Sequence, residues 1–198
     1  MTAPPKRRGS GPPPDAATLH EAALDYLARY AATEVGLRRV LERRVDRWAR
    51  MATGGGADRD DVAAQAASAR NIVRDVVSRL VAAAAVNDVT FAQSRSRSLV
   101  RAGRSRRAVV AHLAAKGVDS EAAHAALPED PATELAAALV LARRRRIGPF
   151  RQSDASDPAQ RNRELAILAR AGFPQDVARR ALAMEPDEAE ALVIQLRR

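Results

Sequence analysis

One pattern occurs twice in the chain, 55 residues apart, and this repeat restricts the possible folds more than any other feature. The corresponding positions are apolar residues, a glycine and an acid: Leu113, Gly117, Val118, Glu121 and Leu127 in the first copy, and Leu168, Gly172, Phe173, Asp176 and Leu182 in the second. Alanine matches are left aside because the chain is rich in alanine. Ungapped repetition at one fixed spacing indicates related structural units.

Each copy predicts a helix, a tight glycine turn and a second helix. Glycine adopts the left-handed conformation that ends many helices, so Gly117 and Gly172 are expected to end the first helix of their copies. Asp119 or Ser120 can then accept a hydrogen bond from the free N–H groups at the start of the next helix. In the second copy Pro174 suits the beginning of a helix, where its missing N–H group would have had no partner.

A weaker third copy is expected near the N-terminus. Its matching positions, 72 residues before those of the central copy, are Thr33, Leu37 and Leu41, which correspond to Ser105, Val109 and Leu113. Thr33 can cap a helix, but Val45 stands where the other copies have glycine. The helix that starts after Thr33 is therefore expected to continue through Trp48 toward Met51.

The composition favours an all-α fold. Hydrophobic residues make up 46% of the chain but aromatic residues only 3%, so each helix has a thin apolar face. Residues that favour helices dominate, and alternating apolar and polar runs typical of strands are scarce. The predicted division is residues 1–16, a disordered basic tail rich in Pro and Gly; 17–87, a first helical module with a flexible GGG loop near 53–60; 88–130, a second, basic module; and 131–198, a third module.

The net charge of +9 predicts an anionic partner, which nucleic acid, an acidic protein surface or an anionic membrane could provide. Arginine supplies nearly all of this charge and binds phosphate and carboxylate alike, so it does not choose between partners. GC-rich coding is an alternative source of the arginines. No apolar stretch approaches ~20 residues and no secretory signal follows the basic N-terminus, so a cytoplasmic protein without a membrane partner is expected.

Residues for catalysis or metal binding are not apparent in the sequence. Cysteine is absent, and His20, His112 and His124 lack the spacing of metal ligands. The three glycines at 54–56 lack the lysine and the Ser or Thr of a phosphate-binding loop, which favours a flexible loop. His112 takes the place of Ile167 in the repeat and is expected to pack against its neighbours. No enzyme activity, cofactor or metal is expected.

Two basic clusters are the candidate binding residues. The first consists of Arg95, Arg97, Arg101, Arg104, Arg106, Arg107 and Lys116. Arg97, Arg101 and Arg104 would share one face of a helix that extended that far. Because residues 89–118 contain no acid, local ion pairs are excluded, and a binding surface is favoured over a merely solvated face.

The second cluster consists of Arg143, Arg144, Arg145 and Arg146. Four consecutive residues point all round a helix, so they cannot all contact one ligand. They also precede Gly148, where cations stabilise a helix C-terminus by about 0.3–1 kcal/mol each. A binding role and a capping role both remain open for this cluster.

The order of these segments resembles the RecX family, regulators of the bacterial recombinase RecA. Residues 23–45, ALDYLARYAATEVGLRRVLERRV, are similar to that family's opening, with its YLA-R motif, a Ser or Thr and a Leu-rich helix. In residues 86–127 an Asp and a Phe-Ala pair precede a basic helix and an L-x-x-KG turn, as in the family's middle part. Residues 157–182 resemble its last part, with an RxGF turn. The chain departs from the family at Val45, at the GGG insertion and in its Pro-rich tail.

The resemblance implies three tandem three-helix modules in an elongated, curved array. It also implies a protein without catalytic activity or cofactor that binds RecA and its nucleoprotein filament. Such a protein restrains filament growth and lowers the ATPase, strand-exchange and co-protease activities. We expect both basic clusters to bind RecA or DNA, with weak direct binding to single- or double-stranded DNA, and we expect a monomer. The alternatives are a general DNA-binding helical protein without a RecA partner and an assembly scaffold.

Overall fold

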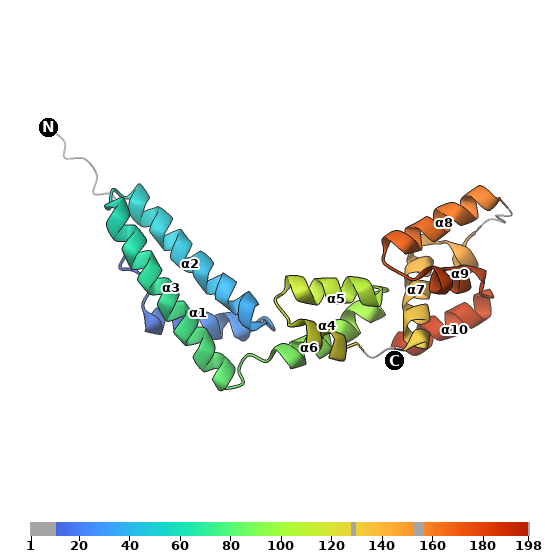
Figure 1. Ribbon diagram of the computed structural model, residues 1–198, viewed down its shortest axis with the longest axis horizontal. Helices are drawn as coiled ribbons and strands as arrows, with labels where there is room; N and C mark the ends of the chain where they lie inside the picture. The colour runs from blue at the N-terminus through green and yellow to red at the C-terminus, as the bar shows by residue number, and fades with distance from the viewer. Residues whose placement is uncertain (1–10, 128–129, 153–156, 198) are drawn as a thin grey trace. The chain divides into compact units, whose positions relative to one another are not determined.

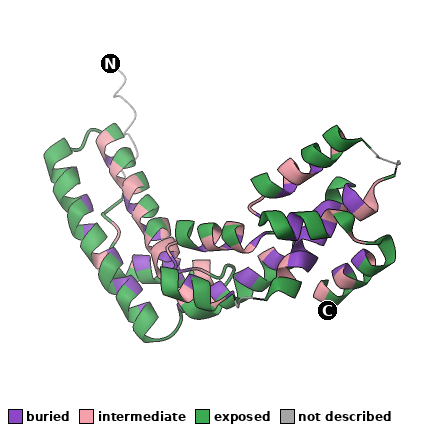
Figure 2. Cartoon of the chain, turned by 45° about the vertical axis from the view of Figure 1, so that its right-hand side comes forward, coloured by how far each residue is buried: buried purple, intermediate pink, exposed green. Residues whose placement is uncertain are grey.

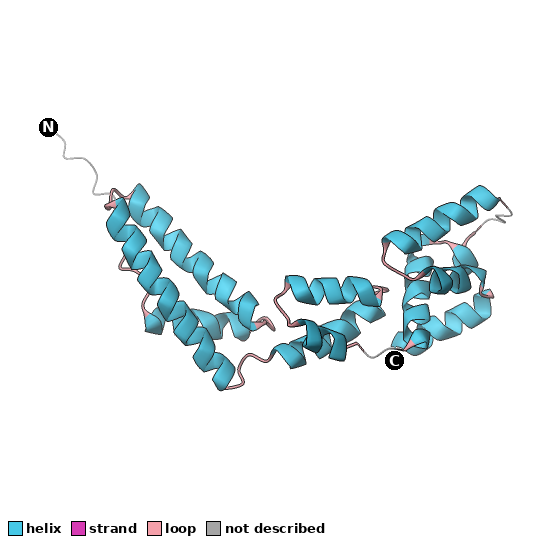
Figure 3. Cartoon of the chain, viewed as in Figure 1, coloured by secondary structure: helices cyan, strands magenta, loops and turns pink. Residues whose placement is uncertain are grey.

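The computed structural model describes residues 11–127, 130–152 and 157–197, and these residues form helices and loops without a strand (Figures 1 and 3). The predicted all-α fold is confirmed. The α-helices are α1 (Ala16–Leu27), α2 (Glu34–Gly54), α3 (Arg59–Ala82), α4 (Asp88–Arg101), α5 (Arg106–Ala115), α6 (Ser120–Ala125), α7 (Pro131–Arg145), α8 (Pro158–Arg170), α9 (Gln175–Ala183) and α10 (Pro186–Arg197), with a 3-10 helix, η1 (Gly148–Phe150), after α7. None of these helices is long and apolar enough to cross a membrane.

The chain forms two compact units, unit 1 (residues 1–88) and unit 2 (residues 89–198). Each unit has its own hydrophobic core. The core of unit 2 runs without interruption through the predicted second and third modules. The separation of these two modules at residue 130, and the curved array of three modules, stay predictions.

Unit 1 is held together by apolar residues on the facing sides of α1, α2 and α3. Leu19 of α1, Leu41 and Val45 of α2 and Val73 of α3 are at most 1% exposed. The Thr33 side chain accepts a hydrogen bond from the Gly36 N–H (2.9 Å), so it caps α2 as predicted. Because Val45 is buried in the core where a glycine turn would otherwise fall, α2 continues as one helix to its end at Gly54.

The predicted disordered tail, residues 1–16, needs a correction. Residues 1–10 lie outside the described residues, but from Gly11 onward the chain has a defined place. The Trp48 indole N–H donates to the Gly11 carbonyl (2.9 Å), and three prolines, residues 12–14, line a pocket with Trp48. Asp15 caps α1, which already begins at Ala16. Proline has little conformational entropy to lose on ordering, so a single aromatic residue can hold a segment that composition alone marks as disordered.

Unit 2 contains both predicted helix–glycine turn–helix copies. The first copy is α5, the turn at Gly117 (φ +85°) and α6, and the second is α8, the turn at Gly172 (φ +90°) and α9. Val118 and Phe173, the residues after the glycines, are both 4% exposed and contribute to the core. Asp119 caps α6 by accepting from the Glu121 N–H (2.8 Å).

The predicted third module contains four α-helices, α7 to α10, where three were expected. Its centre is α7, in which every residue from Leu135 to Ala142 is buried. A helix that is apolar on all sides must be surrounded, and α9, α10 and η1 all pack against α7. Figure 2 shows how the buried residues concentrate on the inner sides of the helices.

Ser105 joins the two copies through a pair of hydrogen bonds. It is fully buried, and its hydroxyl accepts from the Ala108 N–H (3.2 Å) at the start of α5. The same hydroxyl donates to the Ala171 carbonyl (2.7 Å), beside the turn that ends α8. A Cβ atom on Gly172 would lie 2.7 Å from this hydroxyl, so glycine at this turn permits the contact.

Replacing Ser105 by Ala should lower the free energy of unfolding of unit 2 by about 2–3 kcal/mol. The change removes a helix cap, worth about 1 kcal/mol, and leaves the Ala171 carbonyl without its bond, at a further cost of about 1–2 kcal/mol. Denaturant unfolding followed by far-UV circular dichroism measures the loss. Asp157→Ala is the matched control, because Asp157 caps α8 from an exposed position. Equal losses in the two variants would contradict the joining role of Ser105.

Candidate anion-binding site

A pocket of about 370 Å³ lies in unit 2 where the chain turns after α4 and where α7 and α8 end. We call it the arginine pocket. Its lining consists of Gly103, Arg104, Leu141, Arg144, Arg145, Ile167, Arg170 and Ala171. Four of these residues are arginines and none is acidic, which is the composition of a site for an anion.

Close contact between the α4–α5 turn and α7 places Arg104 at this pocket. Gly103 has a φ of +77°, and a Cβ atom there would lie only 2.9 Å from the main-chain nitrogen of Leu141. From the other side, Nη1 of Arg144 donates to the Ala102 carbonyl (3.4 Å) at the end of α4. Residues 38 and 42 positions apart in the sequence therefore meet at one site.

Helix ends alone do not neutralise the pocket. The C-termini of α4, α7 and α8 lie at it, and each carries a partial charge of about −0.5. A negative partial charge at a helix C-terminus attracts arginine side chains, which is the capping role left open for the second cluster. The three partial charges amount to roughly −1.5 against four guanidinium groups, so the pocket keeps a net positive charge that favours an external anion.

The condition under which Arg97, Arg101 and Arg104 would share one helix face is not met. Helix α4 ends at Arg101, and the left-handed Gly103 turns the chain before Arg104. Arg95, Arg97 and Arg101 lie exposed on α4, while Arg104 lies in the arginine pocket.

Arg106 and Arg143 are predicted binding residues whose partners come from other segments of unit 2. The Arg106 guanidinium donates to the Leu127 carbonyl, and its main-chain N–H donates to the Glu134 carboxylate (3.0 and 3.2 Å). Arg143 forms an ion pair with Glu190 (2.5 Å). Residues 89–118 contain no acid, but α7 brings Glu134 to the main chain of Arg106. The partner of Arg143, which belongs to the second cluster, comes from α10.

The remaining predicted residues lie apart from the arginine pocket. Arg107 lines a different pocket together with Glu134, whose pKa is raised because the carboxyl group is partly buried. Lys116 occupies the C-cap of α5, and Arg146 is the left-handed C-cap of α7 (φ 55°). The structure thus brings together Arg104, Arg144 and Arg145 from the eleven predicted residues.

Arg170 belongs to the pocket and was missing from the sequence prediction. It is the last residue of α8 and precedes the Gly172 turn. The first copy of the repeat has Ala115 at the same position, so comparing the two copies did not single out Arg170. The available signal was a cation at a predicted helix C-terminus, a position that several other arginines share.

His112 reports on the electrostatics beside the pocket. It is half-buried, and Nε of Arg95 lies 3.3 Å from its Nε2 atom. Burial, followed by the charges of Arg95, Lys116 and Arg104, lowers the pKa of His112. A lowered histidine pKa means that folding disfavours the protonated ring. The stability of the fold with a neutral ring is therefore fully present above the ordinary value near ~6.5, and part of it is lost as the pH falls from there through the lowered pKa of the folded protein.

A bound polyanion should raise the pKa of His112. It would offset the charges of Arg95 and Arg104 but leave the burial of the ring unchanged, so the rise should be partial. Proton NMR titration of the His112 ring, with and without a saturating single-stranded oligonucleotide, measures the shift. Sodium chloride at matched ionic strength is the control, because general screening acts without binding. An unchanged pKa in a saturated complex would place the anion away from α4 and α5.

Other polar clusters give no metal site. In residues 11–127, 130–152 and 157–197, no group of three or more His, Asp or Glu side chains could hold a metal ion. The fold and the pocket define the class: an all-α protein with repeated helix–turn–helix units and an arginine-lined pocket.

Comparison with known proteins identifies the family. Residues 87–127 match the family model described as RecX, second three-helix domain. The regulatory protein RecX of Myxococcus xanthus (strain DK1622) is 39% identical over 170 residues, which cover 85% of this chain and 86% of that protein. The regulatory protein RecX of Agrobacterium fabrum (strain C58 / ATCC 33970) is 36% identical over 109 residues, 55% of this chain and 58% of that protein. This chain belongs to the RecX family of regulatory proteins.

A solved structure supports the fold. The crystal structure of RecX from Lactobacillus salivarius matches with a TM-score of 0.58 over 89% of this chain and 97% of that chain. The sequences are only 18% identical, so this comparison bears on the fold alone.

Proposed function

We propose that this RecX-family protein binds RecA and the RecA nucleoprotein filament and restrains filament extension. In doing so it lowers the ATPase, recombinase and co-protease activities that depend on the filament. Membership of a family of regulatory proteins, over 85% of the chain, is the observation that supports this function most strongly. The action requires binding alone, so neither catalysis nor a cofactor forms part of the proposal, and the protein acts as a monomer.

The arginine pocket supports a partner that is rich in negative charge. A filament of protein on DNA offers both phosphates and acidic side chains. Guanidinium groups bind either of them through two parallel hydrogen bonds. Arg97 and Arg101, exposed on α4, add charge outside the pocket and support weak direct binding to single- or double-stranded DNA.

Titration of this protein into the cognate RecA on single-stranded DNA, with the ATPase rate as readout, tests the function. Inhibition well below one molecule per RecA is expected, because a molecule that blocks filament growth affects many subunits. Inhibition only near saturation of the DNA would indicate competition for the strand. An unchanged rate at every ratio, with the folded protein present, would contradict the proposal.

A general DNA-binding protein without a RecA partner is the second candidate, favoured by the acid-free lining of the arginine pocket. Such a protein would bind DNA alone tightly, and its affinity would fall steeply with salt as counterions are released. Equal affinity for bare DNA and for the RecA filament would select this alternative.

A further inference from the structure

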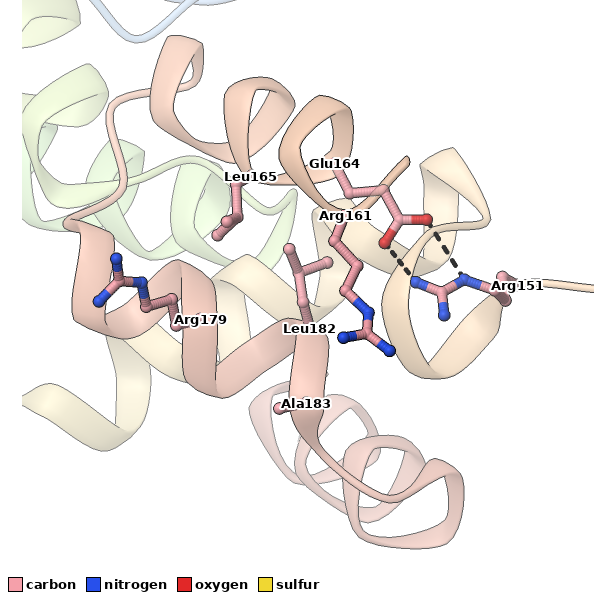
Figure 4. A pocket seen from close by; sticks show the side chains of 7 residues that line it. All are labelled: Arg151, Arg161, Glu164, Leu165, Arg179, Leu182 and Ala183. Atoms are coloured by element: carbon pink, nitrogen blue, oxygen red, sulfur yellow. Dashed lines mark hydrogen bonds and ion pairs between the residues drawn. The ribbon is translucent and has the colours of Figure 1, made fainter. Parts of the chain in front are cut away.

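A second pocket, of about 430 Å³, lies between α8, α9 and the residue that follows η1 (Figure 4). Its lining consists of Arg151, Arg161, Glu164, Leu165, Arg179, Leu182 and Ala183. It shares no residue with the arginine pocket. We call it the α8–α9 pocket, and its chemistry differs from that of the arginine pocket in two respects.

The first difference is a buried carboxylate that fixes one of the arginines. Glu164 is 3% exposed and accepts hydrogen bonds from the Gly148 N–H (3.2 Å) and from two nitrogens of Arg151 (Nε 3.3 Å, Nη2 2.5 Å). Both carboxylate oxygens are therefore used inside the protein. The two-point contact holds the Arg151 guanidinium group at the wall of the pocket, and its Nη1 group is not used in this pair.

Two further arginines extend over the same pocket without a partner of their own. Arg161 of α8 and Arg179 of α9 are exposed, and in the part of the chain that the structure describes their guanidinium groups form no hydrogen bond or ion pair. Figure 4 shows Arg161 extending between Leu182 and Arg151, with Arg179 on the other side of Leu182. Three guanidinium groups and one carboxylate leave the pocket with an excess of positive charge.

The second difference is the apolar part of the lining. Leu165 and Leu182 are half-buried, and Ala183 is exposed beside them. A phosphodiester backbone would pair with the arginines but leave these side chains against water. A peptide that carries an apolar side chain between carboxylates would satisfy both, because the apolar group covers the leucines while the carboxylates meet the guanidinium groups.

We propose that the α8–α9 pocket binds an acidic protein segment that carries an apolar side chain, and that RecA supplies this segment. The choice of RecA rests on the proposed function. The arginine pocket, with four arginines and no carboxylate, then takes the phosphates of the filament. In this division, the α8–α9 pocket contacts the RecA protein and the arginine pocket contacts the DNA of the filament.

Binding of full-length protein to immobilised RecA, in the absence of DNA, tests the division. Arg161→Ser with Arg179→Ser should weaken this binding about tenfold or more, and Leu165→Ala about threefold to tenfold. Arg163→Ser with Arg180→Ser is the matched control, because these exposed arginines lie on the same two helices and line neither pocket. The control and an arginine-pocket variant, Arg104→Ser with Arg170→Ser, should both bind DNA-free RecA like the wild type.

The other possible results would overturn the pocket assignment, alone or together with the proposed function. Unchanged RecA binding by the Arg161 and Arg179 variant would overturn the pocket assignment and leave the proposed function standing. Wild-type protein that binds the filament but not DNA-free RecA would do the same. Loss of affinity for a dT20 oligonucleotide alone in that variant, with RecA binding intact, would make the α8–α9 pocket a nucleic-acid site. Wild-type protein that binds neither RecA nor the filament would overturn both proposals.

Discussion

Replacing Arg104, Arg144 and Arg170 together by alanine should weaken binding to the RecA filament on single-stranded DNA by roughly 10²-fold. The three side chains come from separate segments and converge on the arginine pocket. A charge-assisted contact at a partly solvated surface contributes on the order of 1 kcal/mol, and 1.4 kcal/mol is a factor of ten in affinity. All three side chains are exposed, so the fold should be retained.

The salt dependence of binding separates this effect from a general loss of charge. Each lost phosphate contact should reduce the slope of log K against log salt by about 1, so the triple variant should lose about 3. The matched control removes three exposed arginines that line neither the arginine pocket nor the α8–α9 pocket: Arg163, Arg180 and Arg197. An equal loss of affinity in this control would show that net charge, and not the pocket, carries the binding.

Local features of the fold were predictable because a few adjacent residues determine them. Thr33 and Ser105 cap their helices as side chains of that type do wherever a helix begins nearby. Gly117 and Gly172 turn the chain because glycine tolerates a positive φ. Val45 continues a helix because a β-branched apolar residue is disfavoured in the left-handed conformation that a glycine turn needs.

The candidate site was only partly predictable, because it depends on contacts between distant segments. The sequence marked Arg104 and Arg144 as members of two separate clusters, and only the packing of the α4–α5 turn on α7 unites them. The same packing removed other candidates, since Glu190 pairs with Arg143 from α10. Charge can be read along a sequence, but ion pairing is decided by tertiary structure.

The burial of α7 on all sides explains why the sequence did not predict which arginines would meet. A long buried helix must be covered on every side, and the segments that cover it bring their helix ends and their arginines to its C-terminus. The sequence predicted a third helical module over residues 131–198, and the resemblance implied three helices in it, without marking one of them as central. The central position of α7 follows from its burial, which only the complete set of neighbours reveals.

Gly103→Ala should lower the free energy of unfolding of unit 2 by about 2–5 kcal/mol and weaken filament binding as well. Alanine at a φ of +77° costs about 1–2 kcal/mol. Its Cβ atom would also lie 2.9 Å from the Leu141 nitrogen and 3.2 Å from the Ala137 carbonyl oxygen. Main-chain atoms inside a packed helix cannot move aside readily, and overpacking of this kind costs about 1–3 kcal/mol more.

Gly56→Ala separates the two contributions. Gly56 has a φ of +94°, but a Cβ atom there would meet nothing within 4 Å, so this variant should lose only about 1–2 kcal/mol, and in unit 1. Hydrogen exchange measured by mass spectrometry resolves the two units, with peptides from α7 reporting on the first variant and peptides from α3 on the second. Equal losses would mean that the α4–α5 turn does not press on α7. A larger loss for Gly103→Ala would show that this contact stabilises unit 2, and weaker filament binding by the same variant would show that it also holds Arg104 in the arginine pocket.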